Sequence, residues 1–284
     1  RDEDARGDRQ LEFTQVDLEM SFVSRDDVLE VTEGCLRHVF KKTLGYEFTD
    51  PFVRLSYEEA MNRFGSDKPD LRYSLELTPF DRFAARSGFN AFRGVLDAGG
   101  TVKALNARGC GGSSRRQIAV LEETAKIYGA KGLAWMKVTE AGLEGGVAKF
   151  FADQAQQIIE ELAAEPGDLL LMAADSWKTC CTALGAVRSR LGRDLGLADP
   201  STFVFCWIID FPLFEYNEEE QRWEAAHHMF SMPQDRYLNT MEQNPGKVKG
   251  DLYDLVLNGY EVASGSIRIH DPEIQKRIFS IVGF

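Results

Sequence analysis

Polar and apolar residues alternate along residues 13–22, close to the start of the printed sequence. One face of an extended chain would carry Thr14, Val16, Leu18, Met20 and Phe22, and the other would carry Phe13, Gln15, Asp17, Glu19 and Ser21. This period of two is typical of a half-buried strand. Because Asp17 and Glu19 repel each other unless a cation lies near them, we expect their face to line a ligand site.

A second strand with a polar face is predicted near the end of the sequence. Its polar residues are Ser266, Arg268 and His270, and its apolar residues are Ile267 and Ile269. Residues 202–210 form a nearly continuous apolar run, which is typical of a central strand buried on both faces. Together the strands predict an antiparallel sheet with one face packed on helices and the other lining a cleft.

The helices have clear start and stop signals. Ser24 followed by Asp27 is a capping-box pattern, and Gly45 ends the amphipathic segment that follows it. From residue 75 to 200, short strands and helices are separated by glycine-rich turns. Strands are expected at 102–108, 132–139 and 167–175, and helices at 115–129, 148–165 and 178–196. The chain is therefore predicted to be an α+β protein in which this segment forms a module of its own.

Composition limits the partners that the chain can bind. A formal net charge of −12 argues against nonspecific coating of nucleic acid, since Lys and Arg supply most of that binding energy. Any RNA contact would be local, and Arg1, Arg6 and Arg9 are candidates, although their mixed-charge run also fits a solvated loop. The sequence has no apolar run long enough to span a bilayer, so we expect an intracellular protein with no membrane partner. Its five cysteines lack zinc-site or disulfide spacing, so we expect reduced thiols.

The polar strand residues could bind a small zwitterion. Arg268 could hold a carboxylate through its guanidinium fork, and Asp17 could accept hydrogen bonds from an ammonium group. No Ser-His-Asp nucleophile pattern is identifiable in the sequence. A transferase that works by positioning and electrostatics would not need one.

Two further acids and one arginine suggest phosphate chemistry. Asp254 and Glu261 are hard oxygen donors suited to magnesium, and Arg1 could stabilise charge on a phosphate. Ordinary ion pairs would explain the same acids and arginines, and the adjacent His227 and His228 could be only a turn feature. The residues alone leave both interpretations open.

Five segments together carry a resemblance to bacterial-type aspartyl-tRNA synthetases, which are class II enzymes. They are residues 1–22, 64–72, 210–215, 227–233 and 253–270. The resemblance implies that the first segment is motif 2 and that residues 75–200 are an inserted GAD domain. Residues 1–74 and 201–284 would then be two parts of one catalytic domain, an antiparallel sheet flanked by helices.

The resemblance also assigns roles to individual residues. It implies nucleotide contacts for Arg1, Asp2, Glu3, Gln10 and Glu261, with Arg1 as the catalytic arginine on the α-phosphate. It implies aspartate contacts for Asp17, His227, His228 and Arg268, with Arg268 as the residue that grips the side-chain carboxylate. It implies tRNA acceptor contacts for Arg6 and Arg9, and magnesium coordination for Asp254 and Glu261.

The implied activity is aspartate-tRNA ligation with ATP and Mg²⁺. The implied partners are L-aspartate, ATP and tRNA(Asp), with tRNA(Asn) left open, and the implied assembly is a homodimer in the cytoplasm or an organelle. The resemblance places Arg1 at the motif 2 arginine. It places Phe284 ahead of motif 3. We therefore expect residues 1–284 to be inactive alone. The family usually has Pro-Phe-Thr after the two histidines, and here Met229, Phe230 and Ser231 follow them.

Three other classes of protein compete with this interpretation. An asparaginyl-tRNA synthetase and an ammonia-dependent asparagine synthetase are disfavoured by the long insertion with residues 64–72. A non-catalytic tRNA-sensing or regulatory fragment with a GAD domain is disfavoured because Arg1, Asp17, Glu261 and Arg268 are all retained.

Overall fold

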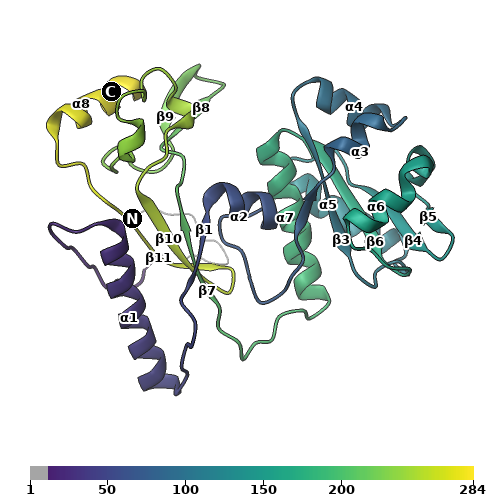
Figure 1. Cartoon of the computed structure of the whole chain (residues 1–284), viewed down its shortest axis with the longest axis horizontal. Coiled ribbons are helices and arrows are strands. Elements are labelled where there is room, and N and C mark those ends of the chain that lie inside the picture. The colour runs from purple at the N-terminus through teal and green to yellow at the C-terminus, as the bar shows by residue number, and fades with distance from the viewer. Residues whose placement is uncertain (1–11) are drawn as a thin grey trace. The chain divides into compact units, whose positions relative to one another are not determined.

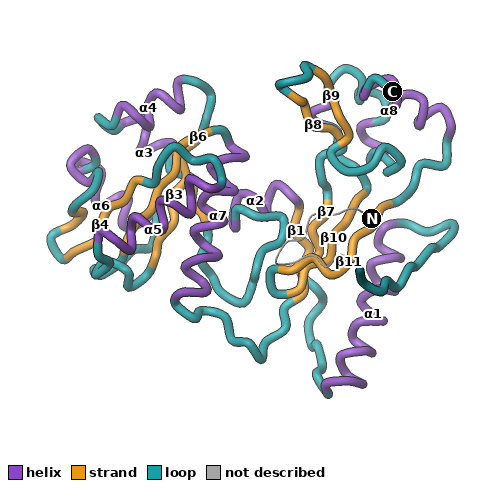
Figure 2. Tube along the Cα trace, turned by 180° about the vertical axis from the view of Figure 1, so that it is seen from behind, coloured by secondary structure: helices purple, strands orange, loops and turns teal. Residues whose placement is uncertain are grey.

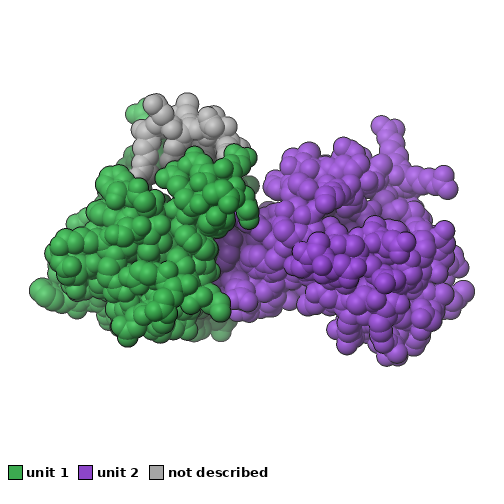
Figure 3. Space-filling model, turned by 90° about the horizontal axis from the view of Figure 1, so that it is seen from above, with its two compact units in different colours: residues 1–54, 205–284 green, residues 55–204 purple. Residues whose placement is uncertain are grey.

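A computed structural model describes residues 12–284 of the chain. The chain divides into two compact units, the first ending at Arg54 and resuming at Phe205, the second running from Leu55 to Val204 (Figure 3). The second unit begins before residue 75 because helix α2 (Tyr57–Phe64) packs against helix α7 (Trp177–Asp194). Among residues 12–284, no helix combines the length and apolar character needed to cross a membrane.

The first unit is built on a four-stranded sheet with strand order β1-β7-β10-β11 (Figure 1). The strands are β1 (Val53–Ser56), β7 (Phe205–Ile209), β10 (Leu252–Leu257) and β11 (Tyr260–Ser266), and the boundary between the units falls within β1. β10 pairs antiparallel with both β7 and β11. Four of the five residues of β7 are buried, which confirms the prediction of a central strand.

One face of this sheet packs on α1 (Arg25–Leu44), the long helix whose limits the sequence predicted. The core of the unit joins Leu29 of α1 to Trp207, Tyr253 and Leu255 of the sheet. Ser24 and Asp27 form the predicted capping box, and Gly45 ends the helix in the left-handed region at φ 65°. The remaining elements are the hairpin β8 (Phe214–Asn217) and β9 (Arg222–Ala225), the short turns η3 (Asp235–Tyr237) and η4 (Pro245–Lys247), and helix α8 (Pro272–Val282).

The strand predicted over residues 13–22 is wrong for the part that the structure describes. Residues 12–22 contain no strand, and Val16 is 94% exposed, so the alternating apolar residues do not enter a core. An alternating sequence forms a strand only where a neighbouring strand pairs with its backbone and a core covers its apolar face. The described part of the chain offers this segment neither.

The second unit contains a five-stranded sheet in the order β2-β3-β6-β4-β5. Strands β3, β4 and β6 are labelled in Figure 2. The strands are β2 (Leu77–Pro79), β3 (Thr101–Ala107), β4 (Ala134–Thr139), β5 (Gly142–Glu144) and β6 (Leu169–Asp175). The helices are α2, α3 (Asp81–Arg86), α4 (Asn90–Asp97), α5 (Arg115–Ile127), α6 (Ala155–Glu161) and α7, with the short turns η1 (Ala148–Phe150) and η2 (Ala152–Gln154).

Both faces of this sheet are covered. Leu169 and Leu171 of β6 pack into a core with α5 and α7, whereas Leu170 and Met172 pack into a second core with α3, α4 and α6. This explains the unbroken apolar run of the strand. The single helix predicted over 148–165 is instead divided into η1, η2 and α6, because Phe151 has φ −125° and turns its ring into the second core.

Candidate active site

The loop that follows the two histidines pairs with the chain just beyond β11. The amide of Met232 donates to the carbonyl of Ile267 at 2.8 Å. Ser231 and Arg268 form an antiparallel bridge pair between the same two stretches. This pairing explains how a loop near residue 230 reaches the chain that carries Arg268, although the two are far apart in sequence.

Arg268 is an exposed residue that contacts two neutral side chains, Ser266 and Phe230. Its Nη1 donates to the hydroxyl of Ser266 at 3.0 Å, and its Cζ lies 4.6 Å from the centre of the Phe230 ring. The His228 ring stacks on the same phenyl ring, with centres 4.8 Å apart and planes at 8°. The structure therefore brings together Arg268 and His228, two of the predicted aspartate-site residues, through Phe230.

Close packing fixes the strand that leads to Arg268. A Cβ atom at Gly265 would lie 2.6 Å from the Tyr253 ring, so only glycine leaves room for the tyrosine on the neighbouring strand. Burial raises the pKa of Tyr253, and the nearby positive charge of Arg268 opposes that increase. Arg268 thus lies close enough to this core tyrosine to act on it electrostatically.

A β-bulge brings the two predicted magnesium acids to one face of the sheet. Asp254 pairs with Ser264, and Val256 pairs with Glu261, with a register shift between these pairs that leaves Val262 without a partner. Paired residues in antiparallel strands point to the same face, and residues two apart on one strand share that face. The extra residue therefore moves Glu261 to the face of Asp254, whereas simple alternation would have placed it opposite.

The chemistry of this pair fits a magnesium ion bound largely by phosphate and water. Mg²⁺ prefers hard oxygen ligands and commonly takes only one or two from protein carboxylates. Asp254 is partly exposed and Glu261 is exposed. Within residues 12–284, no group of three or more His, Cys, Asp or Glu side chains is placed to hold a metal.

An ion-pair cluster joins α1 to the ends of two strands of the sheet. Nη1 of Arg25 lies 3.1 Å from Oδ1 of Asp210, just after β7, and 3.0 Å from Oδ1 of Asp251, just before β10. Burial raises the pKa of Asp251, while the charge of Arg25 opposes this effect. The cluster thus connects the start of α1 to the end of β7 and the start of β10.

The structure describes two further predicted site residues, Asp17 and His227. Asp17 is exposed in the irregular segment described above. His227 packs edge-on against Phe211, with ring centres 5.0 Å apart. The predictions for Arg1, Asp2, Glu3, Arg6, Arg9 and Gln10 lie outside the described residues.

Sequence reasoning missed the contacts that surround Arg268. It noted Phe230 and Ser231 only as a departure from a family pattern, and it placed Ser266 on a polar strand face without a partner. Their proximity depends on the pairing of two distant segments, which periodicity within either segment does not reveal. The nearest signal was the position of Phe230 and Ser231 immediately after the histidine pair.

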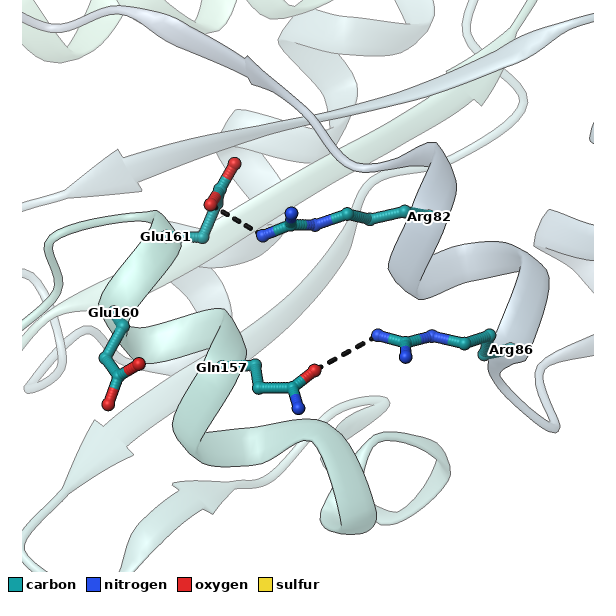
Figure 4. Close-up of a pocket in the computed structure, with 5 residues that line it drawn as sticks. All are labelled: Arg82, Arg86, Gln157, Glu160 and Glu161. Atoms are coloured by element: carbon teal, nitrogen blue, oxygen red, sulfur yellow. Dashed lines mark hydrogen bonds and ion pairs between the residues drawn. The ribbon is translucent and has the colours of Figure 1, made fainter.

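The second unit contains a separate surface hollow of about 630 Å³ between α3 and α6 (Figure 4). Arg82 pairs there with Glu161 at 2.6 Å, and Arg86 donates to Gln157 at 3.1 Å. Because these side chains already bind one another and none is a predicted site residue, we place the candidate active site on the sheet of the first unit.

Comparisons with known proteins show the family to which the chain belongs. Residues 1–284 match the tRNA synthetases class II (D, K and N), and the chain belongs to this family. It is 60% identical to an aspartate–tRNA(Asp/Asn) ligase of Treponema denticola, with all of this chain and 49% of that protein aligned.

Two further relatives show the same partial coverage. An aspartate–tRNA(Asp/Asn) ligase of Treponema pallidum is 55% identical, with the whole chain and 47% of the relative aligned. An aspartate–tRNA ligase of Macrococcus caseolyticus is 47% identical, with the whole chain and 48% of the relative aligned. The chain thus spans about half the length of these curated relatives.

Proposed function

We propose that this chain carries part of the catalytic machinery of an aspartate-tRNA ligase. The α-carboxylate of L-aspartate attacks the α-phosphorus of ATP, which forms aspartyl-adenylate and releases pyrophosphate. A hydroxyl of the terminal adenosine of tRNA then attacks the aspartyl carbonyl, and AMP leaves. The observation that carries the proposal is the cluster of Arg268, Phe230 and His228, next to a strand pair with two acids on one face.

The side chains divide the work of binding and orientation. Arg268 pairs with the side-chain carboxylate of aspartate through its guanidinium fork, while His227 and His228 approach the amino acid from the loop. Asp17 accepts hydrogen bonds from the substrate ammonium. Asp254 and Glu261 would hold Mg²⁺, which supplies charge neutralisation on the phosphates when bound.

The residues before the described part complete this proposal. Arg1 contacts the α-phosphate, the segment with Asp2, Glu3 and Gln10 binds the nucleotide, and Arg6 and Arg9 approach the tRNA acceptor end. The second unit is the inserted GAD domain, and the intact protein is a homodimer in the cytoplasm or an organelle. The names of the Treponema relatives support tRNA(Asn) as a second substrate beside tRNA(Asp).

Pyrophosphate exchange in the native protein that contains this chain tests the proposal. Wild-type protein should exchange pyrophosphate into ATP with aspartate and not with asparagine. Arg268→Ala should lower kcat/KM for aspartate at least about a hundredfold, since a lost charged pair costs about 3 kcal/mol and each factor of ten is about 1.4 kcal/mol.

Arg277→Ala is the matched control. Arg277 lies on α8 of the same unit, where its Nε pairs with Glu242 at 2.5 Å, and it is partly exposed. Its removal should leave aspartate activation unchanged. Exchange that depends on asparagine, or an Arg268→Ala protein with wild-type kinetics, would refute the proposed function.

A further inference from the structure

The hydroxyl of Ser266 is shared between Arg268 and a residue of the histidine loop. Nη1 of Arg268 donates to Ser266 Oγ at 3.0 Å, and the Ser231 hydroxyl donates to the same oxygen at 3.0 Å. A guanidinium group can only donate hydrogen bonds, so Ser266 is the acceptor in its contact with Arg268. The hydroxyl of Ser231 therefore restrains Ser266 Oγ, the oxygen that accepts the hydrogen bond from Arg268.

Both serines are fixed to the backbone framework. Ser231 is 0% exposed, and its backbone forms the bridge pair with Arg268 itself. Ser266 is the last residue of β11 and pairs in register with Leu252 of β10. The hydroxyl pair thus joins the sheet to the loop at the level of the arginine.

The Phe230 ring supplies a second constraint on Arg268. The guanidinium carbon lies 4.6 Å from the ring centre, within the range of a cation–π contact. Serine and phenylalanine orient the guanidinium without neutralising it, whereas a carboxylate partner would compete with an acidic ligand. A long side chain held in this way loses less conformational entropy when it binds a carboxylate.

We propose that Ser266 and Ser231 are positioning residues for Arg268 and thereby determine selectivity for an amino acid with a side-chain carboxylate. The inference rests on the proposed function, in which Arg268 binds that carboxylate. Ser266 sets the direction of the guanidinium fork, and Ser231 locks Ser266. Threonine at position 231 would keep the required hydroxyl.

Exchange kinetics with aspartate and asparagine test this inference in the native protein that contains the chain. Ser266→Ala and Ser231→Ala should each raise the KM for aspartate about tenfold, while the KM for ATP stays within about twofold. The preference for aspartate over asparagine should fall by a similar factor. Ser231→Thr should restore wild-type values, because it keeps the hydroxyl donor.

Ser280→Ala is the matched control, since Ser280 is exposed on α8 and donates to the carbonyl of Lys276. Wild-type aspartate kinetics in both alanine variants would overturn the inference. So would equal losses for aspartate and ATP accompanied by a lower Tm, because these indicate a general structural role. Wild-type protein without aspartate-dependent exchange would instead reject the proposed function itself.

Discussion

Arg188 shows how one buried charge can organise a segment by binding its backbone carbonyls. It is 1% exposed, and its guanidinium donates to the carbonyls of Leu75 at 2.6 Å, Asp70 at 2.8 Å and Tyr73 at 3.0 Å. The Tyr73 ring lies 4.3 Å from its Cζ. Arg188 therefore anchors the end of segment 64–72, one of the five that resemble the synthetase family, to helix α7.

Replacing this arginine should destabilise the second unit. Arg188→Met leaves three carbonyls without their donor, and we expect the free energy of unfolding to fall by about 3 kcal/mol. Arg190→Met on the same helix removes only a partly exposed pair with Asp194 and should cost at most about 1 kcal/mol. Urea unfolding followed by circular dichroism measures both, and equal effects would show that Arg188 is not an anchor.

At the level of single residues, the sequence named candidate site residues by type but did not reveal which side chains lie together. Arg268 and His228 were selected by residue type and by family resemblance, and the structure brings them together through Phe230. The hydroxyl pair of Ser231 and Ser266 was not foreseen, because it joins two segments that meet only in the fold. A side chain's neighbours depend on tertiary pairing, which local patterns do not specify.

At the scale of elements, the limits of α1 were predictable, whereas the helix expected over 148–165 and the faces of the strands were not. The Ser24 cap and the Gly45 stop act within one turn of the chain, so the sequence around them was sufficient to place α1. The alternation over 13–22 failed because a strand needs a partner. The bulge at Val262 was equally hidden, although it decides which face carries Glu261.

The contact between α2 and α7 requires glycine at position 185. A Cβ atom at Gly185 would lie 2.2 Å from the carbonyl oxygen of Gly65, which belongs to the backbone and cannot simply move aside. We expect Gly185→Ala to force the helices apart and to lower the free energy of unfolding by about 2–3 kcal/mol.

Gly94→Ala in α4 provides the control for this prediction, because no atom lies within 4 Å of its new Cβ. That change should be neutral or stabilise the unit by up to about 1 kcal/mol, since alanine favours a helix over glycine. Urea unfolding of both variants distinguishes them. A Gly185→Ala protein as stable as Gly94→Ala would mean that the helices can separate without loss.

For the whole molecule, the distribution of core residues defines two units with separate hydrophobic cores. The two large cores of the second unit draw all their buried members from Leu75 to Leu191, whereas the core of the first unit combines residues from both ends of the sequence. The second unit therefore contains all the strands and helices that form its two large cores.

We predict that residues 55–204 fold on their own. Their sheet is covered on both faces, and a domain of about 150 residues buries enough surface for independent stability. The isolated segment should unfold in urea as one cooperative transition, and Gly185→Ala should lower its midpoint as it does in the whole chain. A gradual, non-cooperative loss of circular dichroism would show that the cores require the first unit, because a self-sufficient domain of this size unfolds in one step.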